Sequence, residues 1–286
     1  MTGAMNLENR TAVITGSASG IGRAIAVSLA RRGCHLALAD VNDAGLSETA
    51  RLAESVQPDP RNRTASRSAL RISQHHLDVA DRRAVVAFPQ AVIDAHPGVD
   101  ILVNNAGVAV GGTFEAVSED DFEWLFEINF WGVVRMTRAF LPLLRKSDDA
   151  RVVNLSSIYG LISPPGETSY SASKFAVRGF SNSLRHELAG SKVGVTVVHP
   201  GGVATSIADN ARVPKNMPPQ EIARRRALAK KALTMPPPSA GEIIVKGIER
   251  RSPRVLVGND AKLLALLERL APISYWKIFM RLLPKS

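Results

Sequence analysis

Residues 11–22 read TAVITGSASGIG, a short apolar run followed by a turn with three glycines and then the start of a helical pattern. Glycine lets the backbone turn sharply and come close to a pyrophosphate, and the following helix offers free N–H groups and the positive end of its dipole. The spacing is Gly-x-x-x-Gly-x-Gly, not the Gly-x-Gly-x-x-Gly of the long-chain dinucleotide fingerprint. Such a turn can also serve only to tighten a corner between a strand and a helix. Its strand–turn–helix context favours a dinucleotide-binding site.

The alternation of strand and helix continues along the chain. Apolar strand-like runs occupy residues 11–15, 36–40, 101–104, 152–155, 193–199 and 254–257. Helical patterns separate them, and the first, over residues 21–32, is ended by Gly33 as its C-cap. Continuous apolar strands separated by helices indicate a parallel sheet that is covered on both faces. We therefore expect an α/β fold with a doubly wound parallel sheet of the Rossmann type.

Two stretches interrupt this rhythm. Residues 58–73 are polar and arginine-rich, which is typical of a loop that extends the second crossover. Residues 206–239 begin irregularly, contain a basic helical patch at 221–233 and close with three prolines, so they are expected to form a lid or binding loop. Neither stretch resembles a domain linker. We expect one domain over residues 1–286, with a lid at about 206–239 and a C-terminal helical extension at about 259–286.

Composition limits the class of protein. The chain has 286 residues, of which 45% are hydrophobic and 22% charged, and these values exclude wholesale disorder. Its single cysteine, Cys34, excludes an intrachain disulfide and is expected at the start of a buried strand. No apolar run approaches the ~18 residues of a membrane-spanning helix, and the polar opening residues do not resemble a secretory signal. We expect a cytoplasmic protein.

The formal net charge of +10 raises the question of nucleic-acid binding. Nucleic-acid binders usually place aromatic residues or a recognisable module beside their basic charge. The chain has three basic clusters, and the first two contain no aromatic residue: Arg61, Arg63, Arg67 and Arg71; Arg224 to Arg226 with Lys230 and Lys231; and Lys277, Arg281 and Lys285. We interpret them as solvated faces and expect no nucleic-acid partner. The histidines lack metal-ligand spacing, so no metal site is expected.

Asp40 closes the second predicted strand, 18 positions after Gly22. A carboxylate there can accept hydrogen bonds from both ribose hydroxyls of NAD, whereas its charge repels the 2′-phosphate of NADP. The alternative is that Asp40 caps the following helix, although Asn42 or Asp43 is better placed for that role. The position favours NAD over NADP.

Tyr170 and Lys174 lie four residues apart in a predicted helix over residues 170–188, and therefore on one helical face. Tyrosine ordinarily has a pKa near 10, and a nearby ammonium together with a positive nicotinamide would favour tyrosinate. The strand over residues 152–155 ends in two serines, 13 residues before Tyr170. Ser157 can lie at the carboxyl edge of the sheet and bind a substrate oxygen. Ser156 is interpreted as a turn or N-cap residue.

Together these motifs resemble the short-chain dehydrogenase/reductase family over about residues 7–205. The family's motifs stand in order as the glycine turn 15–22, Asp78-Val79, the Asn-Asn-Ala-Gly sequence 104–107, Asn129, Ser157, Tyr170 with Lys174, and the Pro-Gly motif 200–205. From residue 206 onward the chain follows no pattern of this kind, and family members diverge there with their substrates.

The resemblance implies hydride transfer between a nicotinamide cofactor and a secondary alcohol or its ketone. We expect the substrate to be hydrophobic. Tyr170 would donate or remove the proton, Lys174 would hold the nicotinamide ribose and lower the pKa of Tyr170, and Ser157 would orient the substrate oxygen. Asn129 would hold a water that links Lys174 to solvent. The cofactor-binding set that it implies comprises Gly16, Ser19, Gly20, Ile21, Gly22, Asp40, Asp78, Val79, Asn105, Ala106, Gly107, Tyr170, Lys174, Pro200, Gly201, Val203 and Thr205.

Relatives of this kind usually assemble as dimers or tetramers through two long helices, which here are expected at residues 118–144 and 170–188. The apolar tail over residues 261–270 and 273–283 must cover the substrate entrance, a neighbouring subunit or a membrane surface. Two other functions stay open: a membrane-surface lipid or sterol reductase, and a non-catalytic cofactor-binding regulator. The complete set of Ser157, Tyr170 and Lys174 argues against the regulator.

Overall fold

Seven parallel strands form one sheet in the computed structural model, which describes residues 3–56 and 69–282. The strands lie in the order β3-β2-β1-β4-β5-β6-β7. The order reverses between β1 and β4, and this is the position where open α/β sheets bind ligands, at the carboxyl ends of the strands. The doubly wound fold expected from the sequence is confirmed. The strands are β1 (Thr11–Thr15), β2 (His35–Asp40), β3 (Ile72–His76), β4 (Ile101–Asn104), β5 (Ala150–Leu155), β6 (Val193–Pro200) and β7 (Arg254–Val257).

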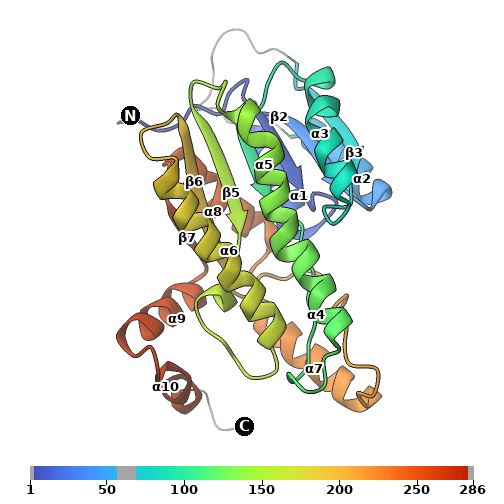
Figure 1. The fold of residues 1–286 in the computed structure, drawn as a ribbon, viewed down its shortest axis with the longest axis vertical. Helices are drawn as coiled ribbons and strands as arrows, with labels where there is room; N and C mark the ends of the chain where they lie inside the picture. The colour runs from blue at the N-terminus through green and yellow to red at the C-terminus, as the bar shows by residue number, and fades with distance from the viewer. Residues whose placement is uncertain (1–2, 57–68, 283–286) are drawn as a thin grey trace.

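Helices cover both faces of the sheet (Figure 1). One face packs against α1 (Gly20–Arg31), α2 (Asp43–Glu54) and α8 (Pro237–Glu249), and the other against α3 (Arg82–Ala95), α5 (Val133–Leu144) and α6 (Thr168–Glu187). Side chains of a strand alternate between faces, so Ile14 belongs to the first core and its neighbour Val13 to the second. Both faces are therefore buried, which explains the continuous apolar strands.

The expected loop over residues 58–73 is wrong at its end, because Ile72 and Ser73 belong to β3. Residues 57–68, with Arg61, Arg63 and Arg67, lie outside the described part of the chain. Strand β3 reads ISQHH and pairs with β2, and each of its residues is at least partly open to solvent. A strand at the edge of a sheet needs no continuous apolar run, so this one resembles a loop in sequence.

The expected helix over residues 118–144 is interrupted. It consists of α4 (Glu119–Phe126), a π-helical turn η2 (Glu127–Gly132) and α5. The expected lid over 206–239 also ends earlier than predicted, because Pro237 starts α8 and Ala240 in that helix is fully buried. Proline suits the first turn of a helix, where its missing N–H costs no hydrogen bond.

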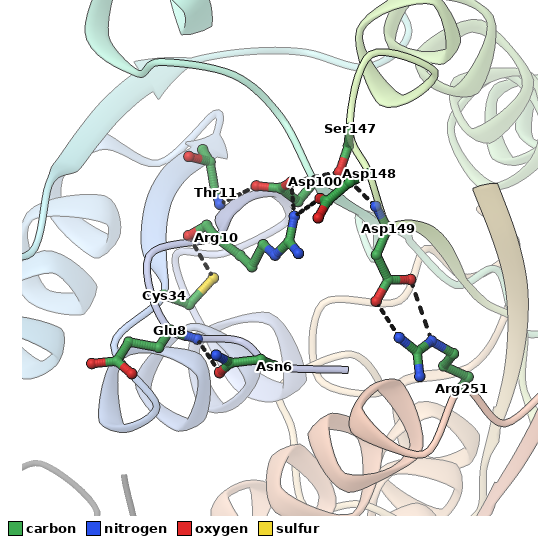
Figure 2. A network of polar contacts seen from close by, with 10 residues as sticks. All are labelled: Asn6, Glu8, Arg10, Thr11, Cys34, Asp100, Ser147, Asp148, Asp149 and Arg251. Carbon is green, nitrogen blue, oxygen red and sulfur yellow. Dashed lines mark hydrogen bonds and ion pairs between the residues drawn. The ribbon is translucent and has the colours of Figure 1, made fainter. Parts of the chain in front are cut away.

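A polar network joins the amino ends of several strands, opposite the edge where a ligand would bind (Figure 2). Asp100 accepts hydrogen bonds from the Arg10 guanidinium and the Thr11 backbone N–H, both at 2.9 Å. Ser147 donates to the same carboxylate at 2.6 Å, and Arg251 pairs with Asp149. These contacts hold the starts of β1, β4 and β5 together and leave the carboxyl ends free of them.

Three helices lie beyond the carboxyl ends of the strands, at the lower end of Figure 1. Helix α7 (Pro219–Ala232) belongs to the expected lid, and α9 (Asn259–Leu270) and α10 (Tyr275–Leu282) form the C-terminal extension. The lid segment forms isolated bridges to the rest of the chain, Val110 with Arg212 at one place and Val203 with Met235 at another. Within residues 3–56 and 69–282, no helix has the length and apolar character needed to cross a membrane.

Candidate active site

The glycine turn leads from β1 into α1 and has the backbone shape expected of it. Gly16 and Gly20 adopt positive φ angles of 65° and 54°, which side chains other than glycine rarely tolerate. A Cβ at Gly22 would lie 2.1 Å from the carbonyl oxygen of Gly16, so that position also excludes a side chain. Ser19 stands at the N-cap position of α1 with no side-chain capping bond, and Ile21 packs partly into the first core. The start of α1 is thereby held close under the turn.

Asn105 ties this turn to the end of β4. Its amide group donates to the carbonyl oxygens of Thr15 and Gly16 at 3.0 and 2.9 Å. The backbone N–H groups of Asn105 and Ala106 donate to the Thr15 hydroxyl, each at 3.1 Å. A Cβ at Gly107 would lie 3.2 Å from Asn129 Oδ1 and 3.4 Å from Lys174 Nζ. Because Gly107 has no side chain, the position that its Cβ would take stays free beside Asn129 Oδ1 and Lys174 Nζ.

Asp40 lies at the carboxyl end of β2, beside the glycine turn. Its carboxylate accepts hydrogen bonds from the backbone N–H groups of Ala18 at 3.0 Å and Asn42 at 3.1 Å. Asn42, not Asp40, caps α2 by accepting from Gly45 N at 2.9 Å. The alternative role of Asp40 as the cap of α2 is therefore wrong, and Asn42, which its position in the sequence favoured, has that role.

The other expected cofactor residues line the same edge of the sheet. Asp78 accepts from the backbone N–H of Ala80 at 2.9 Å, and Val79 is buried against Gly132. Pro200 ends β6, and the loop after it approaches the glycine turn, since the Thr205 methyl would lie 3.1 Å from a Cβ at Gly20. Hydrogen bonds to β7, α9 and the lid fix the backbone of this loop. Gly201 N donates to Val257 O at 2.9 Å, Gly202 N to Asp260 Oδ2 at 2.7 Å and Ala204 N to Met235 O at 2.8 Å. Val203 in the same loop is buried.

Ser157, Tyr170 and Lys174 come together where β5 ends and α6 begins. The Ser157 side chain lies close enough to the Tyr170 hydroxyl to lower its pKa. The Lys174 ammonium lies 5.5 Å from the centre of the Tyr170 ring and donates to the Leu155 carbonyl oxygen at 3.2 Å. Within the described residues that is its one hydrogen bond, so this buried cation keeps N–H donors directed to the space beside Gly107.

Burial acts on the pKa of both members of this pair. It raises the pKa of Tyr170, and the Ser157 side chain acts in the opposite direction. It lowers the pKa of Lys174 to about 8. The expected lowering of the Tyr170 pKa by Lys174 stays a prediction.

Asn129 occupies the π-helical turn η2 and is completely buried. Its side chain exchanges two hydrogen bonds with the backbone of Val108, at 2.8 and 2.9 Å, and donates to Ser173 Oγ at 3.2 Å. The widened turn thus aims this side chain at the segment after β4 and at α6. Asn129 lies within reach of the same space as Lys174, because both approach Gly107.

The interpretation of Ser156 as a turn or N-cap residue is wrong. Ser157 caps the short helix η3 (Ile158–Gly160) by accepting from Tyr159 N at 3.1 Å. Ser156 is buried and donates to the Lys174 carbonyl oxygen at 2.8 Å, which joins β5 to α6. Neighbouring side chains alternate in direction at the end of a strand, so only one of the two serines can face the site.

The sequence alone did not indicate a role for His199. It is buried at the end of β6, and its Nδ1 lies 2.9 Å from the Ser157 carbonyl oxygen. Burial lowers the pKa of this histidine to about 4, so the ring is neutral and its Nδ1–H holds the backbone of Ser157. Strand register brings β5 and β6 together there, and no spacing along the chain reveals such a contact.

Across the described residues no group of three or more His, Cys, Asp or Glu side chains could hold a metal ion.

The family model for short chain dehydrogenases matches residues 10–216, which is most of the chain and contains every residue that the sequence motifs assign to the site. The chain therefore belongs to the short-chain dehydrogenase/reductase family and is an oxidoreductase. Members of the family use NAD or NADP, act on small-molecule substrates and are typically oligomeric.

Similar proteins include SadH of Mycobacterium tuberculosis, which is named an oxidoreductase and is 40% identical over 279 residues, 96% of this chain and 95% of that one. A short-chain dehydrogenase/reductase from Burkholderia phymatum, solved in complex with NAD, superposes with a TM-score of 0.82 at 28% identity, over 99% of this chain and 98% of that one. An alcohol dehydrogenase from Thermococcus sibiricus, complexed with 5-hydroxy-NADP, has a TM-score of 0.63 at 27% identity and covers 80% and 92%.

Proposed function

We propose that this chain is a nicotinamide-dependent dehydrogenase that interconverts a secondary alcohol and its ketone. The observation that carries the proposal is the group formed by Ser157, Tyr170 and Lys174. The Ser157 side chain acts on the pKa of Tyr170, and the Lys174 ammonium lies 5.5 Å from the centre of the Tyr170 ring. An alcohol or ketone oxygen that binds beside the two hydroxyls would be within reach of a transferable proton.

The residues of the site fit a nicotinamide dinucleotide. Gly16 and Gly20 have positive φ angles that shape the turn before α1, where a pyrophosphate would meet the free N–H groups of the helix. Gly107 has no side chain beside Lys174 Nζ, which would let the nicotinamide ribose approach this ammonium. When bound, the dinucleotide supplies or accepts the hydride. The protein's part is to hold the ribose hydroxyls with the Lys174 ammonium and to place the loop that contains Val203 and Thr205 along the opposite side.

The protein's side chains handle the proton. Tyr170 donates its phenolic proton to the carbonyl oxygen during reduction and accepts the alcohol proton during oxidation. Ser157 donates a hydrogen bond to the same oxygen and orients it. Lys174 and Asn129 form the route by which the proton returns to solvent, through a water held by the asparagine. A buried asparagine held by three hydrogen bonds is rigid enough for that task.

We propose NAD as the preferred cofactor. The Asp40 carboxylate stands at the end of β2, where a 2′-phosphate would meet its negative charge. Arg23, the nearest candidate for binding such a phosphate, is occupied by the Ala18 carbonyl oxygen and by Thr49 Oγ1 at 3.0 Å. The complex of the Burkholderia relative with NAD agrees with this preference, whereas the Thermococcus relative binds a derivative of NADP.

The substrate is proposed to be hydrophobic. The loop after Ser157 contributes Ile158, Leu161 and Ile162 to an apolar cluster that it shares with α9 and α10, and the lid exposes Leu228.

The proposed assembly is a dimer or tetramer through α5 and α6, where Leu141, Pro142, Phe180 and Leu184 line a shallow hollow between the two helices. Light-scattering mass would test the assembly.

The test of activity is a panel of secondary alcohols, from short diols to sterols, incubated with the full chain and NAD while NADH formation is followed. We expect turnover with at least one apolar secondary alcohol and none with the Tyr170→Phe variant. NADH formation that is equal in the two proteins would contradict the proposed chemistry. NADH binding without turnover of any alcohol or ketone in the panel would instead favour the cofactor-binding regulator.

A specific observation keeps the membrane-surface reductase as the second candidate. Helix α9 exposes Leu263, Leu266 and Leu270, and Ile273 beyond it is 97% exposed. Such side chains could rest on a lipid surface beside the basic residues of the extension. Sedimentation with anionic liposomes tests it, and a protein that stays in the supernatant would exclude this candidate.

A further inference from the structure

Glu167 is a carboxylic acid placed immediately before the catalytic helix. It stands at the N-cap position of α6, three residues before Tyr170, and its carbonyl oxygen accepts from Ser171 N at 2.8 Å. Its backbone forms a bridge with Gly112, whose N–H also donates to the Gly166 carbonyl oxygen at 3.0 Å. The position of Glu167 is therefore fixed from both sides, and residues three apart at the start of a helix are neighbours on its surface.

Glu167 is half-buried. Burial raises the pKa of Glu167 to about 7, against the opposing effect of Arg225. The charge of Glu167 contributes to the raised pKa of Tyr170 and to the raised pKa of Tyr159. The rings of these two tyrosines pack edge-on, with their centres 6.0 Å apart. Glu167 thus gains a negative charge near neutral pH, at the place where tyrosinate must form.

Arg225 on the lid helix α7 lies beside the residue before Glu167 and acts on the pKa of its carboxyl group. The Nη1 and Nη2 atoms would lie 3.5 and 3.8 Å from a Cβ at Gly166, the residue before Glu167. Gly166 has a φ of 80°, a conformation that favours glycine, and the guanidinium lies within contact distance of this residue. Glu221 on α7 accepts from Arg225 Nε at 3.0 Å and holds the arginine in this direction. Arg224 also pairs with Glu221, at 3.6 Å, but its side chain is 74% exposed.

We propose that Glu167 tunes proton transfer at Tyr170, that its carboxylate opposes formation of the tyrosinate, and that Arg225 on the seated lid helix weakens this opposition. The position of the lid would then be coupled to the chemistry. Tyr170 loses a proton to become tyrosinate and regains it, and no other group changes covalently. Glu167 acts through Tyr170 and is therefore a positioning residue. The inference rests on the proposed function, because it takes Tyr170 as the group that exchanges the proton.

The experiment measures ionisation of Tyr170 directly, with no substrate. The chain has three tyrosines, so the ultraviolet absorbance of tyrosinate, recorded for the full chain saturated with NAD and corrected with the Tyr170→Phe variant, isolates this residue. Glu167→Gln should move the midpoint to lower pH by about one unit, a tenfold change in the ratio of tyrosinate to tyrosine. Arg225→Gln should move it to higher pH. The double variant should match Glu167→Gln alone, because the arginine acts through the carboxylate.

Arg224→Gln is the matched control, since it neutralises the neighbouring cation on the same helix, and it should leave the midpoint unchanged. The midpoint of Arg225→Lys should lie between those of the unmodified protein and of Arg225→Gln. An unchanged midpoint in Glu167→Gln would overturn the inference, as would an Arg225→Gln shift that persists in the Glu167→Gln background. If Glu167→Gln does not fold, the comparison of Arg225→Gln with Arg224→Gln still decides: equal midpoints reject the coupling. If Tyr170→Phe removes no titrating signal, the proposed role of Tyr170 fails instead.

Discussion

Tyr170 and Lys174 lie in surroundings that disfavour the charged form of each side chain. Burial disfavours both the tyrosinate and the ammonium, and it lowers the pKa of Lys174 to about 8. A positive nicotinamide bound beside them would favour tyrosinate through its charge. In the protein alone the neutral form of Tyr170 is therefore favoured.

Replacement of Tyr170 by phenylalanine should separate proton transfer from binding. The ring and its edge-on contact with Tyr159 remain, while the transferable proton is lost. We expect kcat to fall by about 100-fold or more, with the Kd for NADH nearly unchanged. Steady-state rates and a fluorescence titration with NADH measure the two quantities. Retention of more than a few per cent of the activity would refute the assigned role.

Asp40 should control cofactor choice. We expect NAD to exceed NADP by at least about tenfold in kcat/KM, which corresponds to roughly 1.4 kcal/mol. The Asp40→Ala variant should narrow this ratio, because the repulsion of the 2′-phosphate disappears. Asp43→Ala is the control, since Asp43 lies three residues on and pairs with His76 at 3.0 Å. Equal use of both cofactors by the unmodified protein would contradict the prediction.

Among the helices, α10 joins the C-terminal extension to the loop that follows Ser157. Tyr275 and Phe279 pack against the apolar cluster that contains Ile158 and Ile162, and the Tyr275 hydroxyl accepts from Ser163 N at 2.8 Å. The extension thus packs on the loop that follows Ser157. Leu283 and Lys285, part of the amphipathic pattern expected for this tail, lie outside the described residues.

Removal of residues 272–286 should impair the use of bulky substrates more than cofactor binding. Helix α10 supports the loop after Ser157, whereas the contact between Asp260 and Gly202 N belongs to α9 and is kept. Kinetics with short and bulky alcohols, NADH affinity, light-scattering mass and liposome binding are compared for the two lengths of chain. Loss of NADH affinity with unchanged mass and substrate range would refute this account. Loss of liposome binding alone would support the membrane-surface candidate.

Over the whole molecule, one ion-pair group joins the start of the chain to its last third. Arg32 at the end of α1 is 4% exposed and pairs with Glu242 at 2.9 Å and Glu249 at 2.7 Å, both on α8. The pKa of Glu242 is lowered to about 2, chiefly by its hydrogen bond with Arg32. Its folded pKa lies below the unfolded value of about 4.3, so its contribution to stability is complete above that value and is lost as the pH falls towards 2.

The Glu242→Gln variant should therefore melt at a lower temperature than the unmodified protein at pH 7, by about 3 °C for each kcal/mol lost. The difference should shrink as the pH falls below about 4, where the unmodified protein loses the same charge. Glu48→Gln is the control, because Glu48 is an exposed carboxylate that pairs with Arg51 within α2. Melting curves by circular dichroism across this pH range measure both. A difference that stays constant with pH would refute the linkage.

Patterns between residues close in sequence determined the doubly wound sheet and most of its strands. The glycine turn, the apolar strands and the four-residue spacing of Tyr170 and Lys174 are local features, because backbone conformation and helical periodicity act over a few residues. The resemblance of the motifs then indicated which side chains meet at the carboxyl edge. The structure brings Ser157, Tyr170 and Lys174 together there.

Only the tertiary structure decided the contacts between distant segments. It made an edge strand of ISQHH, directed Ser156 to Lys174 rather than to a turn, and set His199 against Ser157. It also brought Arg225 of the lid against the residue before Glu167 and laid α10 on the loop after Ser157. These contacts depend on strand register, on which face of a helix is buried and on the path of long loops. Because such contacts depend on the packing of the whole chain, they leave no spacing in the sequence by which they could be found.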